Sequence, residues 1–143
     1  MDEETIDTRC PSQVTDDYWI YAERQQGSYP EATDEGSGKW MVFVTRDKID
    51  SVWNTIADAI RQGKLGDEAK VSTARPNPNA ANEKEHVICI YTYDYRDVED
   101  VKRIRATLRD LGIYWKIPYK TDAATYAGLY QVRGHKRIST YYE

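Results

Sequence analysis

Two short segments of the chain are apolar at nearly every position, as in a strand that is covered on both faces. Residues 39–45 read Lys-Trp-Met-Val-Phe-Val-Thr, and residues 86–93 read His-Val-Ile-Cys-Ile-Tyr-Thr-Tyr. Both are rich in β-branched and aromatic residues and too short for a typical buried helix. We therefore predict two strands near the centre of a sheet. Residues 69–74 alternate small or apolar with polar side chains, which predicts a half-buried strand.

Two longer segments repeat apolar residues at steps of three and four, the spacing of one helix face. The first begins at Asp47 and ends at Gly63, and the second begins at Asp94 or Asp97 and ends at Gly112. Glycine commonly ends a helix because it adopts the left-handed conformation without strain. The stripes are Ile49, Val52, Trp53, Ile56, Ala59 and Ile60 in the first segment, and Val98, Val101, Ile104, Leu108 and Leu111 in the second. We expect Trp53 to be buried between helix and sheet.

The remaining segments of the chain have weaker patterns. Thr15 is a possible cap for a short helix over residues 16–26, which has acidic residues at its start. Residues 27–38 are rich in Gly and Ser and predict a linker. Further strands are predicted over residues 114–120, 129–132 and 138–142.

This order of elements predicts an α+β fold of two layers, because two amphipathic helices can cover only one face of the sheet. We divide the chain into an acidic N-terminal segment at 1–37, with its short helix and linker, and a single α+β domain at 38–143. A length of 143 residues, 40% hydrophobic and 31% charged, is ordinary for one globular domain. No apolar run approaches the ~20 residues that a membrane helix needs.

Composition narrows the class of protein further. The first residues, Met-Asp-Glu-Glu, carry no apolar stretch, so we expect no secretory signal and a cytoplasmic protein. Cys10 and Cys89 make neither a disulfide framework nor metal-ligand spacing, and we expect no metal or cofactor. Twelve Tyr and four Trp stand against one Phe. This bias fits either a sheet with Tyr on its wet face or a groove that stacks planar ligands.

Charge is unevenly distributed along the chain. Residues 1–37 hold ten acidic side chains against two arginines, a balance of −8, whereas residues 102–137 hold nine basic against two acidic, a balance of +7. The asymmetry indicates a basic surface for phosphates, or an acidic arm that makes a self-contact with such a surface. Solvated helix faces are the alternative explanation.

Candidate ligand contacts are basic residues at strand positions, since no catalytic motif is present. Lys70 alternates with Val71 and so faces the side of the sheet that is opposite to the helices. Arg75 reaches the same side only if the backbone turns after Ala74. Convergent Lys and Arg side chains suit a phosphate or carboxylate. The predicted set is Lys70, Arg75, Lys120 and Arg133.

Several segments in order resemble the basophilic leukaemia-expressed protein family, a domain of unknown function. They are residues 38–44, 63–72, 86–92, 111–113 and 119–122, and the resemblance spans about residues 38–130. That family is similar in fold to the eukaryotic mRNA cap-binding translation initiation factor. The resemblance implies a curved, mostly antiparallel sheet with helices on its convex face and a ligand groove on its concave face.

Carried over by position, the resemblance gives Arg75 a phosphate-binding role. It does not supply the two loop tryptophans that stack on the cap, because residue 44 runs almost directly into the helix and the stretch 63–70 is short. We therefore expect a non-catalytic domain whose basic groove takes a nucleotide, an RNA strand or another phosphate-bearing ligand.

Two alternatives remain. The family is also similar to bacterial phosphothreonine lyases, which implies Lys70 as a catalytic base. Met41 then stands where the acidic His is expected, and a thioether cannot donate a proton. The other alternative is a protein-interaction module without a nucleic-acid role.

Overall fold

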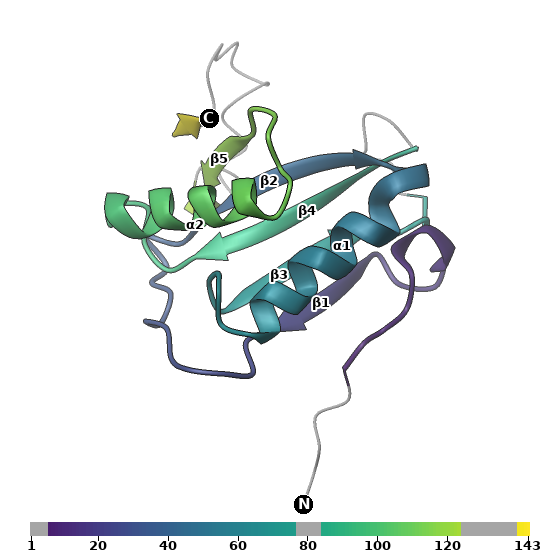
Figure 1. Cartoon of the computed structure of the whole chain (residues 1–143), viewed down its shortest axis with the longest axis horizontal. Helices are drawn as coiled ribbons and strands as arrows, with labels where there is room; N and C mark the ends of the chain where they lie inside the picture. Colours follow the sequence, from purple (N-terminus) through teal and green to yellow (C-terminus); the bar gives the residue numbers. More distant parts are fainter. Residues whose placement is uncertain (1–5, 77–83, 124–139) are drawn as a thin grey trace, which may run out of the picture.

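A computed structural model describes residues 6–76, 84–123 and 140–143 (Figure 1). The elements are a short 3₁₀ turn (Pro11–Gln13), β1 (Trp19–Glu23), β2 (Gly38–Thr45), α1 (Arg46–Arg61), β3 (Glu68–Ser72), β4 (Glu85–Thr92), α2 (Val98–Asp110), β5 (Pro118–Thr121) and β6 (Tyr141–Tyr142).

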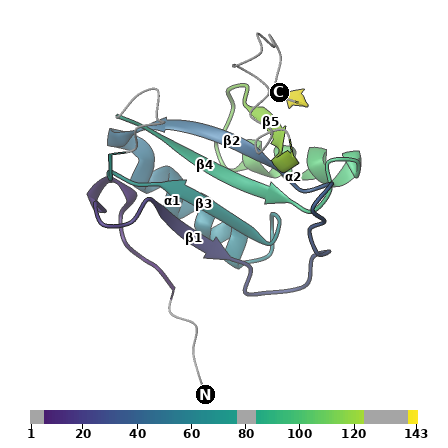
Figure 2. The ribbon, with the colours of Figure 1, turned by 180° about the vertical axis from the view of Figure 1, so that it is seen from behind.

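The strands form one curved, antiparallel sheet in the order β1-β3-β4-β2-β5-β6. Both helices lie on the same face of it, in front of the sheet in Figure 1 and behind it in Figure 2. This arrangement confirms the predicted α+β fold. We call the face turned away from α1 and α2 the concave face. No helix in the described ranges is long and apolar enough to cross a membrane.

The core lies between the sheet and the two helices. Trp53 of α1 is 1% exposed, as predicted from its place in the apolar stripe. Trp40 of β2 is fully buried, and its indole N–H donates to the Val101 carbonyl of α2 at 3.0 Å. The two strands predicted to be central, β2 and β4, are confirmed in the middle of the sheet, where they are neighbours.

Helix ends follow the local chemistry of the sequence. The Asp97 side chain accepts from the Asp100 backbone N–H at 3.2 Å, which caps the first turn of α2. Gly63 and Gly112 follow the two helices with φ of 77° and 102°, a region that other residues seldom enter.

The helix predicted over residues 16–26 is wrong, because Trp19–Glu23 form the edge strand β1. Ile20 pairs with Val71 of β3 and is fully buried, whereas its neighbour Tyr21 is 47% exposed. This alternation has the period of a strand. Because β1 pairs with β3, residues 19–23 share one sheet with strands that come after residue 38. Asp16 and Asp17, which suggested a helix start, form ion pairs with Arg9 at 3.5 and 3.0 Å.

Near the C-terminus the strands are shorter than predicted. β5 begins at Pro118 rather than at residue 114, and Tyr114 is exposed. β6 falls within the strand predicted over 138–142. The strand predicted over 129–132 lies outside the described residues, as does Arg133.

Candidate ligand site on the concave face

Strand register brings three lysines to the concave face. Lys70 of β3 lies opposite Cys89 of β4, and Lys39 of β2 lies opposite Lys120 of β5. Tyr91 of β4 pairs with Lys39 and shares this face, because it is two residues from Cys89. The sheet therefore groups side chains from four strands that are far apart in the sequence, on the face seen in Figure 2.

Lys70 is held between aromatic rings. Its ammonium nitrogen lies 3.9 Å from the centre of the Trp19 ring and 6.0 Å from the centre of the Tyr91 ring. Such cation–π contacts orient a lysine without neutralising it. Within the described part of the chain, no carboxylate lies within 4.0 Å of the Lys70 ammonium group. Lys70 thus presents an oriented positive charge.

Lys39, unlike Lys70, is buried and paired with a carboxylate. It is 7% exposed, and its Nζ pairs with Asp122 at 2.8 Å. The Ser37 hydroxyl donates to the other oxygen of Asp122 at 2.7 Å, so this ion pair is anchored. The Lys39 charge is therefore already compensated by a carboxylate.

Electrostatics link the third lysine to the same cluster. Burial and the positive charge of Lys39 lower the pKa of Lys120. Burial raises the pKa of the Cys89 thiol to about 11, despite the opposing effect of Lys70 and Lys39. Burial also raises the pKa of Tyr91 well above its usual range. Cys89 and Tyr91 are therefore neutral near pH 7 and add no negative charge beside the three lysines.

Arg75 makes contacts of a different kind. Its guanidinium donates to the Asp16 carbonyl at 2.9 Å and lies 4.1 Å from the centre of the Tyr18 ring. These contacts attach the residues before β1 to the residues after β3. Of the four residues predicted from the sequence, the structure brings Lys70 and Lys120 to one face and places Arg75 against the N-terminal segment.

Sequence reasoning missed Lys39, Tyr91 and Trp19 as members of this cluster. Lys39 and Tyr91 belong to segments predicted to be covered on both faces, and Trp19 was assigned to a helix. Their alternation with Trp40, Ile90 and Ile20 was the available signal, because those three neighbours are fully buried in the core. To place these residues in one cluster, the order of the strands in the sheet must also be known, and local pattern does not give that order.

In the described ranges, no histidine lies near Lys70 to act as the acid that a lyase requires. His86 pairs with Val44, on the side of the sheet that faces the helices, and its ring contacts Arg46 and Ser72. Met41 lies beside Cys89 on the concave face, as its strand position dictates. The histidine that the lyase resemblance calls for is thus not found beside Lys70 in the described ranges.

The fold is similar to that of a solved structure, a schistosome eIF4E in complex with m7GpppA and 4E-BP. The TM-score is 0.57 at 16% sequence identity, and the match covers 76% of this chain. It covers 60% of that chain, so the present chain spans less than two thirds of the length of this neighbour. The likeness shows a shared fold.

The sequence itself matches one family over most of its length. The match runs over residues 22–128, from the end of β1 to beyond β5, and the family is described as basophilic leukemia-expressed protein Bles03. The match includes the strands that carry Lys39, Lys70 and Lys120. The chain belongs to the Bles03 family.

Proposed function

We propose that the concave face is a non-catalytic binding site for a phosphate-bearing ligand, a nucleotide or a strand of nucleic acid. The observation that carries this proposal is the state of Lys70, whose ammonium group is oriented by Trp19 and Tyr91 and has no ion-pair partner in the described ranges. A buried or half-buried cation without a counter-ion is stabilised when an anion arrives. Lys120 adds positive charge from β5.

Aromatic and basic side chains interleave across the strands of this face. Trp19 and Tyr21 of β1 flank Lys70, Tyr91 follows on β4, and the Lys39 ammonium lies 6.0 Å from the centre of the Tyr91 ring. Surfaces of this composition suit nucleotides, because the rings stack on bases and the ammonium groups meet phosphates. The similar solved structure is itself bound to m7GpppA, which supports a ligand of this class.

Carboxylates limit the positive charge of the site. Asp122 compensates Lys39, and Glu68 stands on the same face as Lys70. Burial raises the pKa of Glu68, and repulsion from Glu23 raises it further. Because the Lys39 charge is compensated by its ion pair with Asp122, we take Lys70 and Lys120 as the phosphate contacts.

Stacking on this face comes from the sheet rather than from loops. β2 ends at Thr45 and α1 begins at Arg46, so no loop between them carries an aromatic residue. Trp19 and Tyr21 of β1 and Tyr91 of β4 are aromatic residues beside Lys70. The proposed site therefore recognises phosphate and a planar group without a sandwich of two loop tryptophans.

The test is a calorimetric titration with inorganic pyrophosphate, guanosine triphosphate and a short single-stranded RNA. Loss of a charge-assisted hydrogen bond typically costs about 1.5–3 kcal/mol, so we expect Lys70→Ala to weaken binding about tenfold or more. Lys64→Ala removes an exposed lysine from the turn after α1 and is the matched control. Equal weakening by both variants, or no binding of any of the three probes, would contradict the proposal.

A further inference from the structure

A second cleft lies on the helix side of the sheet, where β5 leaves β2. β5 pairs with β2 only at Gly38, Lys39 and Trp40, and it begins at Pro118. Proline has no backbone N–H to extend the ladder, and the chain before it runs over the helix layer instead. A gap therefore remains between the end of β2, α1 and the loop that follows α2.

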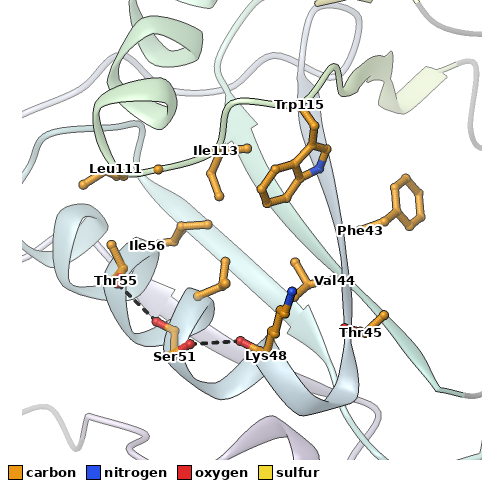
Figure 3. A pocket seen from close by; sticks show the side chains of 12 residues that line it. Phe43, Val44, Thr45, Lys48, Ser51, Thr55, Ile56, Leu111, Ile113 and Trp115 are labelled. Atoms are coloured by element: carbon orange, nitrogen blue, oxygen red, sulfur yellow. Dashed lines mark hydrogen bonds between the residues drawn. The ribbon is translucent and has the colours of Figure 1, made fainter.

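This gap is a cleft of about 400 Å³ (Figure 3). Ile56 of α1 and Ile113 of the loop form its floor and are both buried. Trp115 forms one wall, with 45% of its side chain exposed, and Val52 lies on the α1 side. An exposed indole over buried aliphatic side chains offers an apolar surface to a small molecule.

The rim of the cleft is polar and positively charged. Lys48 is the one charged side chain among the described lining residues, and Figure 3 shows it extended beside Val44. The hydroxyls of Ser51 and Thr55 line the same side and donate to backbone carbonyls of α1 at 3.2 and 3.1 Å. Their oxygens remain able to accept a hydrogen bond from a ligand.

The neighbouring carboxylate does not neutralise Lys48 by direct contact. Asp47 accepts a hydrogen bond from the Thr45 hydroxyl at 2.5 Å, and that bond lowers the pKa of the Asp47 carboxyl. No ion pair joins Lys48 to a carboxylate anywhere in the described ranges. The cleft therefore combines an apolar floor with a single cation at its mouth.

We propose that this cleft binds a small amphipathic anion, with an aromatic or aliphatic body against Ile56, Ile113 and Trp115 and an acidic group at Lys48. The volume falls within the roughly 300–1,000 Å³ of typical ligand pockets. Charge complementarity selects the ligand class, since the described lining residues carry Lys48 and no carboxylate. This site is independent of the lysines on the concave face, which lie on the other side of the sheet.

The probe is 8-anilino-1-naphthalenesulfonate, an aryl sulfonate whose fluorescence rises in apolar surroundings. We expect saturable binding with energy transfer from tryptophan. Lys48→Gln should weaken binding about fivefold to tenfold, because the sulfonate loses its cation. Thr55→Phe should abolish binding by filling the cleft from an exposed position of α1.

Controls separate this site from other surfaces. Asn54→Phe places the same side chain at an exposed neighbouring position on α1 that does not line the cleft, and Lys64→Gln removes a charge elsewhere. Both should bind the probe as the unaltered protein does. The proposal is overturned if the folded protein does not bind the probe, if Lys48→Gln and Thr55→Phe both leave binding unchanged, or if Lys70→Ala reduces it instead.

Discussion

His86 is a buried histidine with both ring nitrogens occupied. The Arg46 Nε–H donates to its Nε2 at 3.0 Å, so Nδ1 carries the proton and donates to the Ser72 carbonyl at 2.7 Å. Burial lowers the pKa of His86, because the charged form loses hydration and Arg46 repels it. The side chain is therefore built into the fold in its neutral form.

A pH dependence of stability follows from this arrangement. The unfolded chain binds a proton at His86 as the pH falls through its ordinary pKa of 6.5, while the folded protein resists. The contribution of His86 to stability is thus present above that pH and is lost below it. We expect urea unfolding to show a loss of stability as the pH falls through about 6.5, and a flatter profile in His86→Gln. An identical slope in the two proteins would assign the loss to other groups.

At the scale of elements, β1 connects the acidic N-terminal segment to the sheet. Its buried side chains, Ile20 and Ala22, contribute to the same core as α1. Beyond the strand, the Thr73 N–H donates to the Tyr18 carbonyl at 3.1 Å, which continues the connection between β1 and β3. The strand therefore covers the edge of β3 and is part of the packing unit.

Ile20→Ala tests this role directly. Truncation of a buried isoleucine typically costs about 2–5 kcal/mol. We expect a loss in that range in the free energy of unfolding, measured by urea denaturation. Tyr21→Ala changes the adjacent, half-exposed residue and should cost less than about 1 kcal/mol. Two small losses would mean that β1 adds little to the stability of the sheet.

Periodicity predicted the elements that bury a long apolar stripe, and it failed where the segment is short. α1 and α2 each repeat their stripe over several turns, so the helices and the burial of Trp53 were predictable. Residues 19–23 are a single short strand preceded by acidic residues, and they pair with β3 about fifty residues away. Local pattern does not decide between strand and helix at that length.

At the candidate site, too, local pattern predicted the face of one residue and missed the contacts that depend on strand pairing. Lys70 could be assigned to the concave face because its neighbour Val71 is a core residue by pattern. Lys39 and Lys120 become neighbours only through the pairing of β2 with β5, which the sequence does not display. Arg75 depends on Tyr18 and on the Asp16 carbonyl, two contacts that follow from the unexpected strand β1.

At the scale of the whole molecule, a net charge of −4 coexists with a lysine cluster on one face. Part of the acidic excess is engaged elsewhere, since Arg9 pairs with Asp7, Asp16 and Asp17 before β1. The lysines of the concave face come instead from β2, β3 and β5. Their grouping is thus a product of the fold and does not follow from the overall charge.

The salt dependence of RNA binding tests whether these lysines meet phosphates. For single strands, log K falls with log[salt] by roughly 0.7 per phosphate that is neutralised. We expect Lys70→Ala to reduce this slope by about 0.7, because its ammonium group has no ion-pair partner in the described ranges. Arg75→Ala should leave the slope unchanged, because Arg75 follows the end of β3 and its guanidinium lies against Tyr18 and the Asp16 carbonyl, outside the strand positions that group the three lysines.

The measurement is fluorescence anisotropy of a labelled single-stranded RNA across a salt series, with Lys64→Ala as the control for a lost surface charge. A smaller slope in Lys70→Ala alone places a phosphate beside β3 and leaves Arg75 its structural role. An equal reduction in Arg75→Ala would instead mean that the Asp16 contact gives way to a phosphate and that the site extends past the end of β3. A slope that neither substitution changes would contradict a phosphate contact at Lys70, whose ammonium group is oriented by aromatic rings and has no ion pair in the described ranges.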